Sequence, residues 1–179
     1  GMPLAIVTAE DNKSQQCNEV SDKTEAYWKR MQEWGEVTPK VNPNDIVFFG
    51  VRDTEPPEDY LLEHHGIRNY PVAEVRYRGL DTCVQEALEQ LKACDLIYLS
   101  FDVDSMDADL VSHGTGTPVS LGFTPEEAFE ILRGIIQSDK VRCFEMVEVN
   151  PTLDEHRNRM AETAFEILDR TTELIQSKL

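Results

Sequence analysis

The amino-acid sequence predicts an α/β fold in which a mostly parallel sheet is flanked by helices. Two observations support this class. Short apolar runs rich in strand formers alternate along the chain with longer stretches of helical periodicity, an order typical of parallel sheets. Charged residues also follow several of these runs, and in such sheets ligands bind beyond the carboxyl ends of the strands. The 179 residues, 40% of them hydrophobic, suffice for one domain with a buried core, so we predict a single α/β domain over residues 1–179.

Four apolar runs are the predicted strands. They are short and are bounded by polar or turn-forming residues, as the buried strands of a parallel sheet are. In chain order they are Ile46–Val51, Tyr70–Val75, Leu96–Phe101 and Val141–Val149. We expect them to belong to one parallel sheet of about four or five strands.

Helical patterns lie between and around these runs. The clearest is Leu80–Ala93, where apolar residues recur at helical spacing opposite a face of acidic residues. Another begins at Thr124, which with Glu127 has the spacing of a capping box. The full set of predicted helices comprises Ser21–Trp34, Pro57–His65, Leu80–Ala93, Thr124–Gln137 and Asp154–Lys178.

Composition excludes several classes of partner. The formal net charge of −17 disfavours nucleic acid and anionic membrane surfaces, because both bind basic faces. No apolar stretch approaches the ~18–20 residues of a membrane span, and no signal peptide is visible at the start. The cysteines are scattered and form no C-x-x-C motif, which favours reduced thiols and a cytoplasmic protein. A cationic small molecule fits the charge best.

A cluster of carboxylates follows the third predicted strand. Asp102, Asp104 and Asp107 lie within six residues of one another, and the first two are spaced to project from the same side of a strand end. Carboxylates held this close repel, and burial makes each charge more costly. A hard cation such as magnesium, manganese or calcium would relieve both costs. From the spacing alone, a solvated acidic turn is the simpler interpretation.

Charge also gathers after two other predicted strands. Asp53 and Glu55 follow Ile46–Val51, and Glu148 lies at the end of Val141–Val149. Because parallel strands end at the same edge of a sheet, we expect these groups to share one site with Asp102 and Asp104.

Three motifs resemble those of the ureohydrolases, the family of arginase, agmatinase and formiminoglutamase. Ser100–Asp107 reads S-F-D-V-D-S-M-D, Gly114–Pro118 reads G-T-G-T-P, and Glu148–Pro151 reads E-V-N-P, in the family's order. The resemblance covers nearly the whole chain. It implies a three-layer arginase-like fold and manganese-dependent hydrolysis of a linear amidine, in which a hydroxide shared by two metal ions attacks the amidine carbon.

The same resemblance implies roles for individual residues. Asp102 would bridge both metal ions and Asp104 would bind one of them. Glu148 would bind the cationic head group of the substrate, although an ordinary salt bridge at a strand end is the alternative. Glu55 would contact the rest of the substrate, and Thr117 would line the pocket. No general acid or base is assigned. The histidines, namely His64, His65, His113 and His156, are expected to be structural or on the surface.

Other metal ligands of the family have no counterpart here. Family members add a histidine and an Asp-x-His-x-x-x-Asp run, whereas no D-x-H occurs between Gly1 and Asp95. The sequence therefore resembles the C-terminal half of a ureohydrolase. We expect a weak manganese site, an exposed edge strand that favours a homo-oligomer, and little activity from the chain alone. The alternative is an inactive fragment or pseudoenzyme that acts as a binding or assembly partner. The substrate could be arginine, agmatine or formiminoglutamate.

Overall fold

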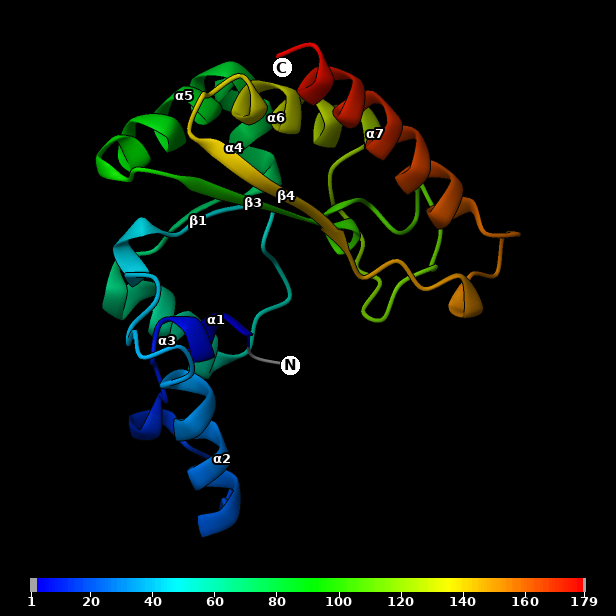
Figure 1. Ribbon diagram of the computed structural model, residues 1–179. Coiled ribbons are helices and arrows are strands. Elements are labelled where there is room, and N and C mark those ends of the chain that lie inside the picture. Colours follow the sequence, from blue (N-terminus) through cyan, green and yellow to red (C-terminus); the bar gives the residue numbers. More distant parts are fainter. Residues whose placement is uncertain (1–2, 179) are drawn as a thin grey trace. The chain divides into compact units, whose positions relative to one another are not determined.

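The structure, a computed structural model, describes residues 3–178, which form two compact units (Figure 1). The first unit combines residues up to 48 with residues 54–68. The second combines residues 49–53 with those from 69 onward. Among the described residues, no helix is both long enough and apolar enough to cross a membrane. All four cysteines are free thiols.

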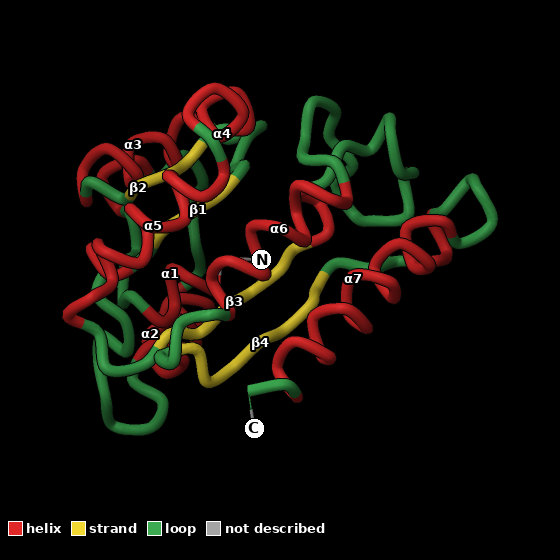
Figure 2. Tube along the Cα trace, turned by 90° about the horizontal axis from the view of Figure 1, so that it is seen from above, coloured by secondary structure: helices red, strands yellow, loops and turns green. Residues whose placement is uncertain are grey.

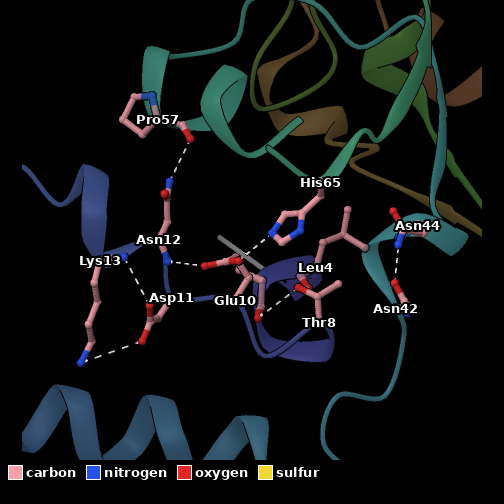
Figure 3. A network of polar contacts seen from close by, with 11 residues as sticks. Leu4, Thr8, Glu10, Asp11, Asn12, Lys13, Asn42, Asn44, Pro57 and His65 are labelled. Carbon is pink, nitrogen blue, oxygen red and sulfur yellow. Dashed lines mark hydrogen bonds and ion pairs between the residues drawn. The ribbon is translucent and has the colours of Figure 1, made fainter. Parts of the chain in front are cut away.

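The first unit is helical. It contains α1 (Pro3–Val7), α2 (Asp22–Gln32) and α3 (Pro56–His65), with single 3-10 turns at Lys13–Gln15 and Pro43–Asp45. The helices predicted for Ser21–Trp34 and Pro57–His65 are thus confirmed, with ends shifted by one or two residues. Polar contacts join its segments: Glu10 Oε2 lies 2.7 Å from His65 Nε2, and Asn12 Nδ2 donates to the carbonyl oxygen of Pro57 at 2.8 Å (Figure 3).

A short sheet pairs β1 (Val47–Phe49) with β2 (Arg68–Tyr70). The rings of Phe49 and Tyr70 stack with their centroids 4.8 Å apart. The strand predicted over Tyr70–Val75 is wrong, because β2 ends at Tyr70 and α4 (Val72–Arg78) begins two residues later. Pro71 has no N–H for a strand ladder, and Val72 and Val75 are both buried at helical spacing.

The second unit is built on β3 (Ile97–Asp102) and β4 (Val141–Val147), which pair in parallel from Ile97 opposite Val141 to Asp102 opposite Val147. Its helices are α5 (Leu80–Gln90), α6 (Pro125–Ile136) and α7 (Arg159–Gln176), besides α4 and single 3-10 turns at Leu91–Ala93, Val103–Ser105 and Pro151–Leu153. Parallel strands flanked by helices confirm the predicted α/β class. The described residues form two sheets of two strands instead of the predicted single sheet.

The core of the second unit lies between the β3–β4 pair and its helices. Figures 1 and 2 show α5 and α6 on one side of the two strands. Ile97 and Phe101 of β3 are buried, whereas Tyr98 is exposed, so one face of the strand carries the core. α6 packs against both α5 and α7. As predicted, the Thr124 hydroxyl accepts from the N–H of Glu127, which completes a capping box at the start of α6.

The two ends of the segment between β3 and α6 lie next to each other. Met106 and Phe123 form an isolated parallel bridge, and the N–H of Asp107 donates to the carbonyl oxygen of Phe123 at 2.9 Å. Gly122 lies against this backbone: a Cβ added there would be 2.4 Å from the carbonyl carbon of Met106. The two ends of the loop are therefore in direct contact, and no side chain larger than hydrogen fits at Gly122.

Gly122→Ala should destabilise the second unit, because a methyl group forces the two backbone segments apart. We expect a loss of about 2–3 kcal/mol in the free energy of unfolding, typical of overpacking. Urea denaturation followed by circular dichroism measures it. Ser120→Ala is the matched control, because Ser120 is exposed and its substitution adds no buried atom. Equal midpoints for the two variants would contradict the close approach at Gly122.

Candidate active site

Two carboxylates lie at the carboxyl end of β3. Asp102 is the last residue of the strand, and Asp104 lies in the 3-10 turn that follows. One Asp102 oxygen accepts from the N–H of Asp104 at 2.9 Å, and the Ser105 hydroxyl donates to the Asp102 carbonyl oxygen at 2.7 Å. Because the chain turns after Asp102, the two carboxylates are placed by this turn, not by the strand alternation that the spacing suggested.

Threonine hydroxyls hold the second carboxylate. Thr115 donates to one oxygen of Asp104 and Thr117 donates to the other. Thr115 is 1% exposed, so its hydroxyl is shielded from water and donates to Asp104 instead. Thr117 was predicted as a pocket residue, and the structure places it directly on Asp104. Thr115 was not singled out, although its position two residues before Thr117 was a signal that both point the same way.

Glu148 joins this group from the end of β4. It is the first residue after the strand, and its φ of 67° is in the left-handed region, which a non-glycine residue seldom adopts. A Cβ built on Gly116 would lie 3.5 Å from Glu148 Oε2, so this side chain reaches the loop between Thr115 and Thr117. The second unit therefore brings Asp102, Asp104 and Glu148 together, with Thr117 beside Asp104. Such unusual backbone geometry is often found at functional sites.

Burial and nearby negative charges make ionisation of Asp102 unfavourable. Desolvation raises the pKa of its carboxyl group to about 6, and the charges of Asp104 and Glu148 act in the same direction. The hydrogen bond from the Asp104 N–H opposes them. Asp102 as a residue keeps solvent-exposed surface, but protein atoms crowd its carboxylate. A bound cation would remove the cost of ionising this group.

The donor set fits only part of a metal site. Asp102 and Asp104 provide carboxylate oxygens, which manganese and magnesium accept. Within residues 3–178, however, no three or more histidine, cysteine, aspartate or glutamate side chains are arranged to hold a metal ion. The second unit thus presents carboxylates suited to a metal without a complete coordination shell.

The remaining acidic candidates are Glu55, Asp53 and Asp107. Glu55 belongs to the first unit, where it is exposed at the start of α3 and its N–H donates to Glu58 Oε2 at 2.8 Å. Its contact with substrate stays a prediction. Asp53 is exposed and has a φ of 57°. Asp107 is buried and accepts from the N–H of Asp109 at 3.0 Å, which is a structural role.

The histidines lie where the structural interpretation placed them. His65 pairs with Glu10, and the ring of His64 stacks on Tyr60 with centroids 5.4 Å apart. His113 and His156 are exposed.

Asp154 is a further residue that contacts the loop carrying Thr115 and Thr117. It was not predicted from the sequence. Its carboxylate accepts from the hydroxyl of Ser112 at 2.9 Å and from the N–H of Met160 at 2.8 Å. A Cβ added at Gly114 would be 2.6 Å from Asp154 Oδ2, so the loop passes close to this side chain. Asp154 thus joins the loop that carries Thr115 and Thr117 to the start of α7.

Comparison with known proteins points to one family. The family model described as the arginase family matches residues 7–172. The arginase of Staphylococcus aureus (strain MRSA252) is 31% identical over 170 residues, which are 94% of this chain and 50% of that protein. The arginase of Bacillus subtilis (strain 168) is 32% identical over 131 residues, 73% of this chain and 44% of the relative. The chain spans about half the length of these relatives.

Solved structures agree with the sequence relatives. The crystal structure of Helicobacter pylori arginase superposes with a TM-score of 0.83 at 32% identity, covering 98% of this chain and 56% of that one. A hypothetical agmatinase from Burkholderia thailandensis has a TM-score of 0.63 at 26% identity, covering 85% of this chain and 44% of its own.

Asp102→Asn should stabilise the metal-free protein at neutral pH. The folded state raises the pKa of Asp102 from 3.8 to about 6, so it binds the proton more tightly than the unfolded chain does. Wild-type stability should therefore fall as pH rises through this interval. After allowance for solvent screening, we expect the variant to gain about 1–2 kcal/mol at pH 7 and little below pH 4.

Urea denaturation at pH 3.5, 5 and 7.5 in the presence of a chelator measures this difference. Asp169→Asn, at an exposed position on α7, is the matched control and should not reproduce the gain. A variant that is less stable than wild type at pH 7.5 would show that the charge of Asp102 is compensated within the protein.

Proposed function

Because the chain belongs to the arginase family, we propose that its second unit provides the carboxylate part of a manganese-dependent site that hydrolyses a C–N bond of a linear amidine. The observation that carries this proposal is the convergence of Asp102, Asp104 and Glu148 at the ends of two parallel strands. An arginine-like guanidinium is the first substrate candidate, followed by agmatine and formiminoglutamate. The negative charge of the chain favours such cationic substrates.

Asp102 and Asp104 are the proposed manganese ligands, with Asp102 bridging two ions. When bound, such a pair of ions activates water and polarises the group under attack. Residues of the protein hold these carboxylates in position. Thr115 and Thr117 each donate to Asp104, which fixes the orientation of its carboxylate. Burial and, to a smaller extent, the charges of Asp104 and Glu148 raise the pKa of Asp102, and a bound cation would offset this cost of ionisation.

Glu148 is the proposed partner of the amidinium head group. A carboxylate can accept two parallel N–H bonds from such a planar cation, which fixes its orientation as well as its charge. Its position over Gly116 places it beside the threonines that hold Asp104. Thr117 and Glu55 are proposed to contact other parts of the substrate. We further propose a cytoplasmic homo-oligomer that binds this small molecule and has neither nucleic acid nor membrane as a partner.

A second candidate function is binding or assembly without catalysis. It is favoured by the finding that the described residues, 3–178, contain no cluster of three or more metal-ligating acidic, histidine or cysteine side chains. Two carboxylates can hold a divalent ion only loosely. On this proposal, the chain retains the family's fold and substrate-binding carboxylate and takes part in an assembly. Metal affinity and turnover separate the two candidates.

Manganese should bind the isolated chain weakly, because two carboxylates leave most of its coordination to water. We expect a dissociation constant of roughly 0.1–1 mM, as at other weak oxygen sites, measured by electron paramagnetic resonance of free Mn²⁺. Asp104→Asn should abolish the binding. Glu173→Gln is the control, because Glu173 is exposed on α7. Binding that survives Asp104→Asn would remove Asp104 from the site.

The chain alone should not turn over arginine, agmatine or formiminoglutamate, because the carboxylates of Asp102 and Asp104 cannot fix two ions. Release of urea, or of the corresponding amidine nitrogen, with excess manganese is the assay. Turnover within the common enzyme range of ~1–10³ per second, lost in Asp102→Ala, would rule out the second candidate. Such a result would also mean that further ligands complete the site.

A further inference from the structure

Arg52 makes contacts unlike those expected of a surface arginine. It follows β1 by three residues, belongs to the second unit and is partly buried. Within the described part of the chain, its side chain donates to backbone carbonyl oxygens alone. Five of them accept: Nε contacts Ser120 at 3.0 Å, Nη1 contacts Gly50 at 3.2 Å and Ser105 at 3.5 Å, and Nη2 contacts Met106 at 3.1 Å and Val119 at 2.6 Å. A guanidinium has five N–H donors, so its capacity matches the acceptors.

Four of these acceptors lie at the two ends of one loop, residues 105–120, which we term the site loop. Ser105 and Met106 come directly after Asp104, and Val119 and Ser120 come two and three residues after Thr117. The guanidinium of Arg52 thus joins the residues directly after Asp104 to the residues after Thr117, the threonine that donates to Asp104. The opposite part of the site loop, at Ser112, is held separately by Asp154.

The charge of Arg52 also faces the acidic site. Burial lowers the pKa of its guanidinium, while the carboxylates of Asp107, Asp104 and Asp53 act in the opposite direction. Arginine stays protonated in proteins, so a permanent positive charge lies under the loop. Arg133 is a useful contrast, because its guanidinium pairs with Glu130 on the same helix.

We propose that Arg52 is a positioning residue that fixes the backbone of the site loop, so that Thr115 and Thr117 hold the carboxylate of Asp104. The residue does not itself touch substrate or metal. Its role in manganese binding rests on the function proposed above, whereas its role in ordering the loop does not. A lysine has one ammonium group and cannot reach both ends of the loop in the same plane, so Arg52→Lys should restore the contact only in part.

Hydrogen exchange measured by mass spectrometry tests the ordering. Amides of the site loop, among them those of Ala108, Leu110 and Val111, should exchange roughly tenfold faster in Arg52→Met than in wild type, with Arg52→Lys between them. Amides of β3, β4 and α6 should keep their rates. Arg133→Met and Arg133→Lys are the matched controls and should leave the site loop unchanged. Equal loop exchange in Arg52→Met and wild type, or acceleration spread evenly over the unit, would overturn the proposal.

A double-mutant cycle tests the link to Asp104. Thr117→Val should weaken Mn²⁺ binding severalfold in the wild-type background and much less in Arg52→Met, because the threonine is already misplaced there. Additive effects of the two substitutions would overturn the link. If wild type binds no Mn²⁺ at any concentration, the proposed function fails. The cycle is then measured by hydrogen exchange of the site-loop amides, where coupled effects of the two substitutions support the positioning role and additive effects overturn it.

Discussion

The parallel ladder between β3 and β4 brings Asp102 level with Val147, and the position of Glu148 follows from that pairing. In a parallel pair both strands end at the same edge, so the first residues beyond them are neighbours although they are far apart in sequence. Helices α5 and α6 lie on one side of the ladder, and Ile97 and Phe101, on one face of β3, are buried. A site assembled in this way depends on the core beneath it, since a change of register would separate its carboxylates.

Gathering negative charge at one strand end costs stability, and the local structure shows how that cost is limited. Asp104 accepts hydrogen bonds from two threonine hydroxyls and lies near the guanidinium of Arg52. Asp102 accepts one hydrogen bond from a backbone N–H, and burial together with the nearby charges raises its pKa to about 6. The asymmetry suits a site in which one carboxylate is oriented beforehand and the other gains most from a cation.

Backbone contacts and buried apolar side chains, among them Met106, Val111 and Phe123, both order the loop between β3 and α6. The Met106–Phe123 bridge closes it, Gly122 permits the close approach, and Arg52 binds carbonyl oxygens at both ends. Carbonyl groups buried without partners would be costly, and one guanidinium satisfies several of them. The glycine and threonine motif at Gly114–Pro118 therefore lies in a loop whose backbone contacts residues distant in sequence.

The sequence by itself determined the α/β class, the strand before Asp102, the capping box at Thr124 and the group of Asp102, Asp104 and Glu148. The first three follow from local periodicity and short motifs, which depend on residues close together in the chain. The group of carboxylates was expected because the predicted parallel strands end at the same edge of a sheet. Only the tertiary structure decided that the chain after Tyr70 becomes a helix. It alone placed Arg52 and Thr115, because their partners are carbonyl and carboxylate groups that come within reach only when distant segments fold back on one another.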